Sequence, residues 1–320
     1  MILTIAFITI GFFLLFKGGD FLVTGAAGIA QKKNIPAFIV GITLVAFGTS
    51  APELFFNVIS ALHGNTEFAL SNVSGSNLIN IAIGIGVSAL VSPLAVTRQK
   101  FSKDLTFLCA GPITAAVCVF FSSATALDIG HGLLLFTGFG LYIYLTGKKM
   151  AAHNQTLPAA AAQTSTSDSC RREWIIFTVG GIMLYVGGEV IYRNALKIVS
   201  YFGLSESIVG LTVIAVGTSI PDCAASIIAT AKNQKDIAVG NILGSNIFNI
   251  FLVLASTIMV YGQPIVFSTS NYFDYATVAV LSVLFAAHAL FHQMVGRVMG
   301  AFLLLCYPAI LSIRIAFFNV

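Results

Sequence analysis

Charged residues are scarce in this sequence, because Asp, Glu, Lys and Arg together make up only 9% of its 320 residues. Soluble domains usually carry about 25%, whereas 57% of this chain is hydrophobic. No soluble fold of this length could bury so much apolar surface. The composition therefore predicts a membrane protein that crosses the bilayer several times.

Cysteine is also scarce, and its distribution excludes a disulfide scaffold. The chain has an odd number, five, and most of them lie inside apolar stretches, which predicts free thiols. No histidine or thiolate cluster accompanies the polar motifs described below, so zinc and copper sites are not expected. The net charge of +4 requires no nucleic-acid partner. The cysteines are Cys109, Cys118, Cys170, Cys223 and Cys306.

Long apolar stretches dominate what remains, and each is long enough for a helix that crosses about 30 Å of hydrocarbon. Their glycines, prolines and central polar residues favour helices over the short alternating strands of a barrel. We predict an all-α polytopic membrane protein with ten transmembrane helices. The stretches run approximately over 2–30, 36–62, 68–92, 105–125, 129–147, 173–200, 205–231, 237–261, 273–291 and 297–318.

One long polar connection, residues 148–172, divides the chain, and its Ala, Ser, Thr and Gln content is typical of a flexible linker. We expect a first five-helix repeat over 1–147 and a second over 173–320. No cleavage motif follows Met1, so the first stretch is expected to remain as a helix.

A duplication supports this division. Residues 41–81 and 210–250 align without a gap at an offset of 169 and share 15 of 41 residues. Most of the identities are Gly, Thr, Ser, Pro or Asn. Shared apolar residues would only indicate that both copies lie in a membrane, but shared polar residues indicate the same chemistry. We therefore infer a duplicated ion site.

The orientation of the two halves follows from their helix count. Five is odd, so the second half must enter the membrane upside down, which gives two inverted-topology repeats. With the N-terminus outside and the linker in the cytoplasm, 12 of the 16 Lys and Arg residues fall on the inner side. This excess of basic residues on the inner side supports the orientation.

The first polar motif in each copy is G-T-S-x-P-[ED]. Thr49 and Glu53 lie four residues apart on one helix face, with Ser50 beside them, and Thr218, Ser219 and Asp222 repeat the arrangement. The prolines that precede the acids, Pro52 and Pro221, lack an N–H. We expect them to free carbonyl oxygens in the preceding turn, near Ala46 and Ala215.

A second polar stripe follows in each copy. Asn72, Ser76 and Asn80 have helical spacing, as do their equivalents Asn241, Ser245 and Asn249. Gly75 and Gly244 would let these helices approach a neighbour closely. Carboxylate, hydroxyl, amide and backbone oxygens suit hard ions such as Na⁺, Ca²⁺ or H⁺.

A purely structural explanation fits single residues better than the whole set. A lone Ser, Thr or Asn in a membrane helix usually bonds to a neighbouring helix, and Asp20 and Glu189 are expected to be solvated or structural at helix ends. Two intramembrane acids at equivalent positions are costly to bury, which favours function.

These segments resemble the two α-repeats of the sodium/calcium exchangers, in the cation/calcium exchanger superfamily. The chain is similar in size to the prokaryotic members, which implies the inner (cell) membrane of a prokaryote. The resemblance implies that Glu53 and Asp222 are central ligands shared by Na⁺ and Ca²⁺. It further implies oxygen ligands from Thr49, Ser50, Thr218, Ser219, Ser76 and Ser245, carbonyls from Ala46 and Ala215, and flanking amides from Asn80 and Asn249.

Three departures from the family pattern bear on selectivity. Asp222 stands where many members carry Glu, which resembles the potassium-dependent branch. Asn249 stands where that branch typically has Asp, so we expect no requirement for K⁺. Asn57 and Ser71 replace the Ser and Gly common in the first repeat.

The resulting hypothesis is exchange of Ca²⁺ for Na⁺ by alternating access, with no enzymatic activity and no resident cofactor. Its partners would be the transported cations and the lipid bilayer, with no nucleic acid and no obligatory protein partner. A Ca²⁺/H⁺ antiporter remains the alternative, because buried carboxylates can take up protons. A passive cation channel would need no inverted duplication, and an intramembrane hydrolase would need a nucleophile and base that the repeats lack.

Overall fold

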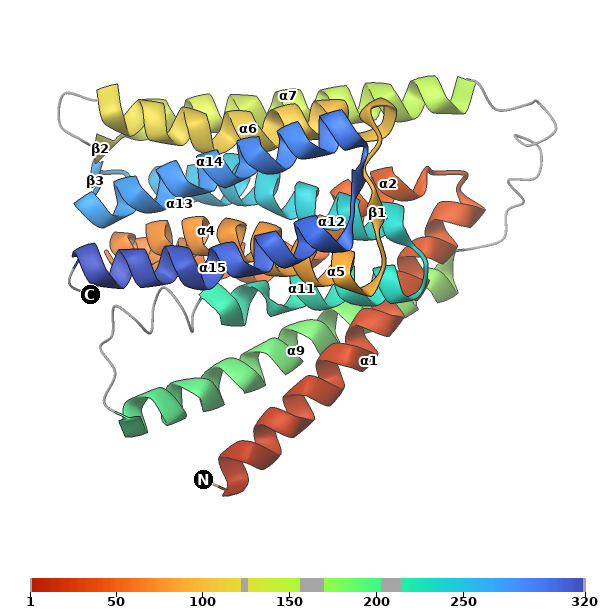
Figure 1. Cartoon of the computed structure of the whole chain (residues 1–320), viewed down its shortest axis with the longest axis horizontal. Coiled ribbons are helices and arrows are strands. Elements are labelled where there is room, and N and C mark those ends of the chain that lie inside the picture. The colour runs from red at the N-terminus through yellow and green to blue at the C-terminus, as the bar shows by residue number, and fades with distance from the viewer. Residues whose placement is uncertain (1, 122–125, 156–169, 203–214, 319–320) are drawn as a thin grey trace.

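The computed structural model describes residues 2–121, 126–155, 170–202 and 215–318, which fold almost entirely into helices (Figure 1). The first half contains α1 (Ile2–Lys32), α2 (Ala37–Val40), η1 (Gly41–Val45), α3 (Ala46–Leu62), α4 (Thr66–Ile79), η2 (Asn80–Ile85), α5 (Gly86–Val91), α6 (Arg98–Phe121) and α7 (Ile129–Gln155). The second contains α9 (Arg171–Phe202), α11 (Ala215–Ala231), α12 (Lys235–Phe248), η4 (Asn249–Leu254), α13 (Ala255–Tyr261), α14 (Thr269–His292) and α15 (Arg297–Phe318).

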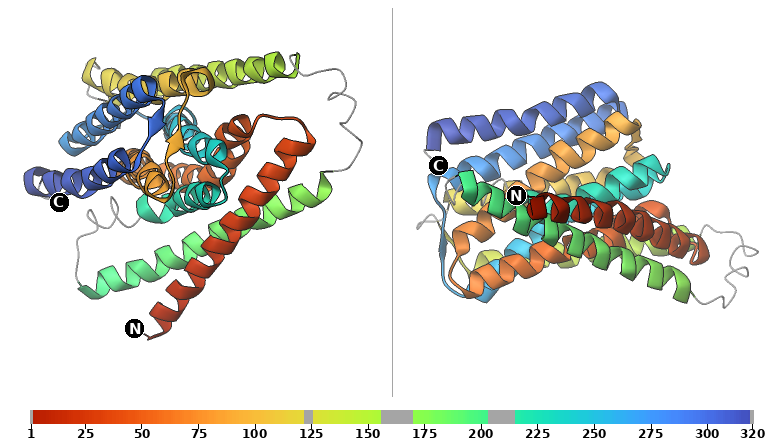
Figure 2. Two further views of the ribbon diagram at one scale, coloured as in Figure 1. Left: turned by 45° about the vertical axis from the view of Figure 1, so that its right-hand side comes forward. Right: turned by 90° about the horizontal axis from the view of Figure 1, so that it is seen from below.

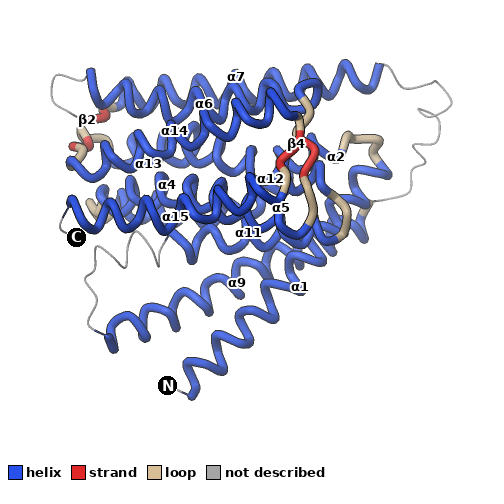
Figure 3. Tube along the Cα trace, in the orientation of Figure 1, coloured by secondary structure: helices blue, strands red, loops and turns tan. Residues whose placement is uncertain are grey.

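Two pairs of short antiparallel strands join the halves at opposite ends of the bundle (Figures 1 and 3). β1 (Leu94–Ala95) of the first half pairs with β4 (Met294–Val295) of the second. β2 (Ala126–Leu127) pairs with β3 (Ile265–Val266). Each half thus contributes one strand at either end.

Seven helices of the described residues are long and apolar enough to cross a membrane. They coincide with seven of the ten predicted stretches: Leu3–Lys32, Ala37–Leu62, Thr66–Val91, Ile129–Ala152, Lys235–Tyr261, Thr269–His292 and Arg297–Phe318. The other three stretches fall on α6, α9 and α11. In α6 the four charged residues all lie in the first seven positions, before the predicted apolar stretch, whereas α9 carries charged residues both at its start and in its second half. The described part of α11 is only 17 residues long.

Three of these spans are composite, because a π-helical segment interrupts the α-helix. The segment η1 precedes α3, while η2 and η4 follow α4 and α12. η2 begins at Asn80 and η4 at Asn249, which are equivalent residues of the two copies. π-Helical turns are rare and frequently occur at functional sites. The sequence did not predict them.

The turns between the paired helices are also repeated. Gly64 follows α3 with φ of +77°, and the equivalent Asn233 follows α11 with φ of +62°. Glycine and asparagine tolerate this left-handed conformation better than other residues. In both copies a backbone N–H reaches back over the end of the helix, from Asn65 to Ser60 at 2.9 Å and from Gln234 to Ala229 at 2.7 Å. These bonds satisfy carbonyls that the ending helix leaves free.

The signature helices occupy the centre of the bundle. In the most apolar 18 residues of the spans Thr66–Val91 and Lys235–Tyr261, 78% and 83% are buried within the protein, against 11% in α15. α1 and α9 lie side by side at one edge and diverge from the other helices (Figures 1 and 2). Gly18 of α1 and Gly180 of α9 permit their contact, because a Cβ on either would lie within 3 Å of the other helix's backbone. The central position of α4 and α12 places the polar stripes away from lipid.

Two predicted segments are described by the structure only in part. α7 continues to Gln155, beyond the predicted start of the linker at 148, and residues 156–169 of the linker lie outside the described residues. The first five residues of the second signature segment, 210–214, also lie outside them.

Candidate ion-binding site

Four helices and two π-helical segments bring the predicted site residues together at the centre of the bundle. Eleven of these twelve residues are buried, and Thr218 is partly buried. They are Ala46, Thr49, Ser50 and Glu53 of α3, Ser76 of α4, Asn80 of η2, Ala215, Thr218, Ser219 and Asp222 of α11, Ser245 of α12 and Asn249 of η4.

Both signature prolines lie inside continuous helices, Pro52 in α3 and Pro221 in α11. The backbone irregularity expected near Pro52 is found further upstream, in the π-helical η1 that ends at Val45. The carbonyl of Ala46 accepts a bond of 3.3 Å from the Thr49 hydroxyl, and the carbonyl of Ala215 accepts one of 3.4 Å from Thr218. These carbonyls therefore face the side-chain oxygens of their own copy.

The carboxylate of Asp222 is held by three neighbouring side chains. Ser245 donates to Oδ1 at 2.9 Å, and the Asn80 amide donates to Oδ2 at 2.9 Å. The hydroxyl of Ser50, from the other copy, lies 3.5 Å from both oxygens. Asp222 is completely buried, so this network replaces the hydrogen bonds that the carboxylate would make in water.

The carboxylate of Glu53 is held much less firmly, although it is equally buried. Its Oε1 accepts one long bond, 3.4 Å, from Ser219. Its Oε2 has no hydrogen-bond partner among the described residues. A buried carboxylate oxygen without a donor is costly, and it is available to a cation.

Contacts between the copies are exchanged reciprocally. Thr49 donates to the Asn241 amide oxygen at 3.0 Å, and its equivalent Thr218 donates to Asn72, the equivalent of Asn241, also at 3.0 Å. The Ser50–Asp222 contact is matched in the same way by that of Ser219 with Glu53. Each acid is thus contacted by the hydroxyl that precedes the other.

The two flanking amides differ sharply. Asn80 donates to Asp222, and its oxygen lies 3.8 Å from the Cys223 thiol. Asn249 is completely buried, and neither atom of its amide has a partner among the described residues. Glu53 and Asn249 thus both carry unpaired atoms, whereas their equivalents Asp222 and Asn80 are bonded to each other.

The site is acidic and suits a hard cation. No ion pair found in the described residues joins a Lys or Arg to Glu53 or Asp222. Burying two carboxylates without a counterion is expensive, so a bound cation or proton must offset their charge. The described residues contain no group of three or more His, Cys, Asp or Glu side chains suited to a metal. The ligands present are two carboxylates and neutral oxygens, as hard ions prefer.

Sequence reasoning missed two buried groups. Asn57 was noted only as a departure from the family pattern, yet it bonds the carbonyl of Glu53 at 2.7 Å. The signal in the sequence was its position four residues after the acid.

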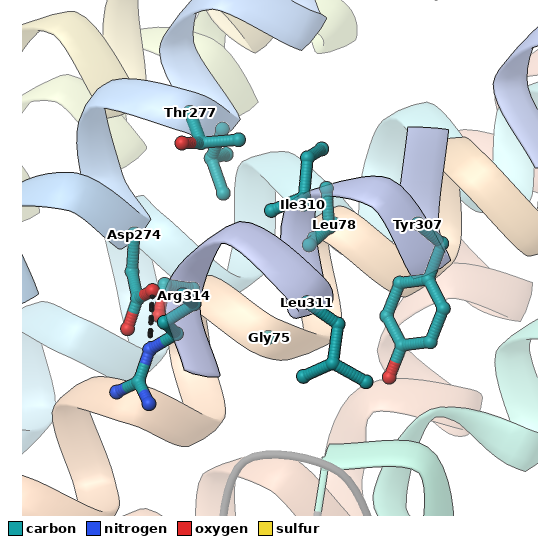
Figure 4. Close-up of a pocket in the computed structure, with 10 residues that line it drawn as sticks. Gly75, Leu78, Asp274, Thr277, Tyr307, Ile310, Leu311 and Arg314 are labelled. Atoms are coloured by element: carbon teal, nitrogen blue, oxygen red, sulfur yellow. Dashed lines mark hydrogen bonds and ion pairs between the residues drawn. The ribbon is translucent and has the colours of Figure 1, made fainter. Parts of the chain in front are cut away.

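The second missed group is an ion pair. Asp274 of α14 and Arg314 of α15 form a buried ion pair at 2.8 Å beside a cavity of about 20 Å³ (Figure 4). Nothing in the spacing of these two residues indicated that they would meet.

The weaker acidic candidates lie in ion pairs outside this cluster. Asp20 pairs with Lys232 at 2.5 Å, and Glu189 pairs with Arg193 at 2.6 Å. Both acids are partly exposed. They lie well inside α1 and α9, however, so the prediction that they stand at helix ends is wrong.

An all-helical membrane bundle with a buried acidic site of oxygen ligands is the pattern of a secondary cation transporter. The family model described as sodium/calcium exchanger protein matches residues 3–148 and 172–316. The chain belongs to this sodium/calcium exchanger family, which confirms the resemblance inferred from its repeats. Members of this family are transporters.

Individual relatives agree over nearly the full length. The inner membrane protein YrbG of Escherichia coli is 31% identical over 89% of this chain and 88% of its own. The sodium/calcium exchanger MaX1 of Methanosarcina acetivorans is 24% identical over 95% of this chain and 96% of its own. The solved structure of the sodium-calcium exchanger NCX_Mj of Methanococcus jannaschii is similar with a TM-score of 0.83, 27% identity and 99% coverage of both chains.

Proposed function

We propose that this protein exchanges Ca²⁺ for Na⁺ across the membrane and does not require K⁺. The observation that carries the proposal is the buried pair Glu53 and Asp222, framed by hydroxyl and amide oxygens from both copies. One Ca²⁺ or two Na⁺ would neutralise the two carboxylates, so either ion set can occupy one shared site. Competition for a shared site is what couples the two ions.

The two carboxylates would have different tasks in this exchange. Asp222 is already fixed by its donors at 2.9 Å, so it offers a ligand of set geometry. Glu53 has an oxygen without a partner, so it can adjust to the ion that arrives. Ca²⁺ tolerates such variable geometry, because it accepts six to eight oxygen ligands at about 2.3–2.6 Å.

Alternating access follows from an arrangement of ten transmembrane helices as two inverted repeats of five, over 1–147 and 173–320, around a cytoplasmic linker at 148–172. The reciprocal contacts of Thr49 with Asn241 and of Thr218 with Asn72 support it, since a pseudo-two-fold axis exchanges such pairs. Inverted repeats can rock about a site at their interface and open it to either side.

The proposed orientation places the N-terminus outside in a prokaryotic cell membrane. Several ion pairs lie at the end of the bundle that would face the cytoplasm, among them Lys32 with Glu173 at 3.1 Å and Lys100 with Asp236 at 2.7 Å. An excess of lysine and arginine at one end supports this orientation.

The deciding experiment uses purified protein in vesicles that are loaded with Na⁺ and placed in Na⁺-free buffer with radioactive Ca²⁺. We expect Ca²⁺ to accumulate only while the Na⁺ gradient is present. Vesicles with equal Na⁺ on both sides, and vesicles without protein, provide the controls. Absence of Na⁺-driven uptake by folded protein would refute the proposal.

The same preparation tests Ca²⁺/H⁺ exchange. The observation that favours this second function is the lack of a basic partner for the two buried carboxylates in the described ion pairs, because protons could also neutralise them. Uptake driven by a pH gradient and indifferent to Na⁺ would establish it. Single-channel currents would instead indicate a passive channel.

A further inference from the structure

Asn57 makes the two halves of the site unequal. It lies one helical turn after Glu53 in α3, is completely buried, and donates its amide N–H to the Glu53 carbonyl at 2.7 Å. The oxygen of the same amide has no partner among the described residues. The equivalent residue of the second copy is Ser226.

The second copy uses a different connection. Asn241 of α12 donates to the Asp222 carbonyl at 3.0 Å and to the Ser226 hydroxyl at 2.9 Å. It also accepts a bond from Thr49. Both ends of this amide are therefore bonded, and it ties α12 to the helix that carries Asp222.

The equivalent amide of the first copy, Asn72 of α4, lacks this tie. Its oxygen accepts from Thr218, but its N–H group has no partner among the described residues, because Asn57 has taken the carbonyl that it would reach. Two buried groups are consequently unpaired in the first copy, Asn57 Oδ1 and Asn72 Nδ2. Glu53 Oε2 is unpaired as well, but for a different reason: Asn249, the equivalent of the Asn80 that bonds Asp222, makes no bond within the described residues. None of the equivalent atoms of Asp222, Ser226 and Asn241 is unpaired.

We propose that Asn57 is a positioning residue that leaves its own amide oxygen and the Asn72 amide N–H unpaired beside Glu53 until ions bind, and that it thereby increases ion affinity. The inference rests on the function proposed above. Unpaired buried polar groups destabilise the ion-free protein. A cation would satisfy the oxygens of Asn57 and Glu53, and water that it carries would accept from Asn72, so binding would remove that destabilisation. Replacing Asn57 with the serine of the second copy would remove it without ions.

The test compares Asn57→Ser with the unchanged protein in two measurements. In Na⁺-free choline buffer with a chelator, the variant is expected to melt about 2–4 °C higher, because the amide of Asn72 can then bond the Glu53 carbonyl and the new hydroxyl. The Ca²⁺ concentration that gives half-maximal thermal stabilisation is expected to rise on the order of tenfold. Radioactive Ca²⁺ uptake should show the same shift in its half-saturating concentration, with maximal uptake retained.

Asn194→Ser is the matched control. Asn194 of α9 donates to the Val190 carbonyl at 2.7 Å, the same i−4 bond as Asn57, but outside the site. Its removal should lower the melting temperature and leave ion affinity unchanged. Asn57→Ala serves if the serine variant folds poorly, and it should shift affinity in the same direction, since Asn72 can still reach the Glu53 carbonyl.

Two results would overturn the inference. If Asn57→Ser lowered the ion-free melting temperature without changing ion affinity, the amide would be only a structural bond. If both quantities stayed unchanged, the unpaired groups would have no energetic role. Failure of the unchanged protein to bind or move either ion would instead contradict the proposed function, so the two failures are distinguishable.

Discussion

At the scale of single residues, the two central acids differ in what they hold in place. Asp222 accepts bonds from Ser245, Asn80 and Ser50, whereas Glu53 accepts one long bond from Ser219. Both acids can carry a charge, but only Asp222 is held firmly in place by hydrogen bonds. The same separation applies to the flanking amides, because Asn80 is bonded and Asn249 is not.

Glu53→Gln and Asp222→Asn are both expected to abolish Ca²⁺ uptake, because each removes one of the two charges that face a divalent ion. Their effects on stability should differ. Hydrogen bonds to a charged group contribute about 1.5–3 kcal/mol, so Asp222→Asn should destabilise the ion-free protein while Glu53→Gln should not. Thermal unfolding and radioactive Ca²⁺ uptake measure the two effects. Normal uptake by either variant would remove that acid from the central role.

Asn249 determines the expected response to potassium. A K⁺ ion accompanying Ca²⁺ would add a positive charge that the two carboxylates cannot balance, and both Asn249 and Asn80 are neutral. Uptake of Ca²⁺ should therefore proceed when choline replaces all K⁺. Asn249→Asp should introduce K⁺ sensitivity or a steeper pH dependence. Uptake that vanished in choline and returned with K⁺ would contradict the charge argument.

The sequence predicted which residues of the two copies come together at the site, but it did not predict how the two copies differ there. Thr49, Ser50, Glu53 and their equivalents stood out because polar residues repeat at a fixed offset in an apolar setting. The bond of Asn57 to Glu53 did not, because a one-residue departure becomes informative only when its partners are known. The roles of the site residues as ion ligands stay predictions.

At the scale of helices, the packing of α12 against η1 and α3 sets the position of Ala46, whose carbonyl is a candidate ligand. A Cβ on Gly244 would lie 2.6 Å from the Ala46 Cβ and 2.7 Å from the Ile42 carbonyl oxygen. A contact this close leaves room only for glycine. The sequence predicted the close approach of Gly244, but it did not indicate the π-helical segment η1 on the opposite side.

Gly244→Ala is therefore expected to destabilise the protein by about 1–3 kcal/mol through overpacking and to reduce Ca²⁺ uptake. Gly140→Ala in α7 is the control, because nothing lies within 4 Å of its added Cβ. Alanine there should be neutral or stabilise the helix by up to about 1 kcal/mol. Thermal unfolding of both variants gives the comparison, and equal melting temperatures would show that α12 can move away without cost.

At the scale of the whole molecule, an ion pair joins α1 to the end of α11 at one end of the bundle. Lys232, which follows α11, contacts the Asp20 carboxylate at 2.5 Å and the Thr24 hydroxyl at 2.7 Å, both in α1. The residues equivalent to Asp20 and Lys232 are Glu189 and His63. Glu189 instead pairs with Arg193 of its own helix, and His63 contacts the Ile59 carbonyl. The interhelical ion pair is thus formed at one end of the molecule and not at the other.

Under the proposed orientation this ion pair lies at the cytoplasmic end, so Lys232→Met should favour opening on that side. A partly exposed ion pair contributes about 0.2–1 kcal/mol, which limits the change to about 1.4- to fivefold. Cys223, adjacent to Asp222 and buried, reports the opening when the other four cysteines are replaced by alanine. Its reaction with a membrane-impermeant thiol reagent should accelerate by that factor in inside-out vesicles and stay unchanged in right-side-out vesicles.

The control is Arg193→Met, which removes an ion pair within one helix and should alter neither rate. An increase confined to right-side-out vesicles would reverse the proposed orientation. No increase on either side would show that the Asp20–Lys232 pair does not restrict opening.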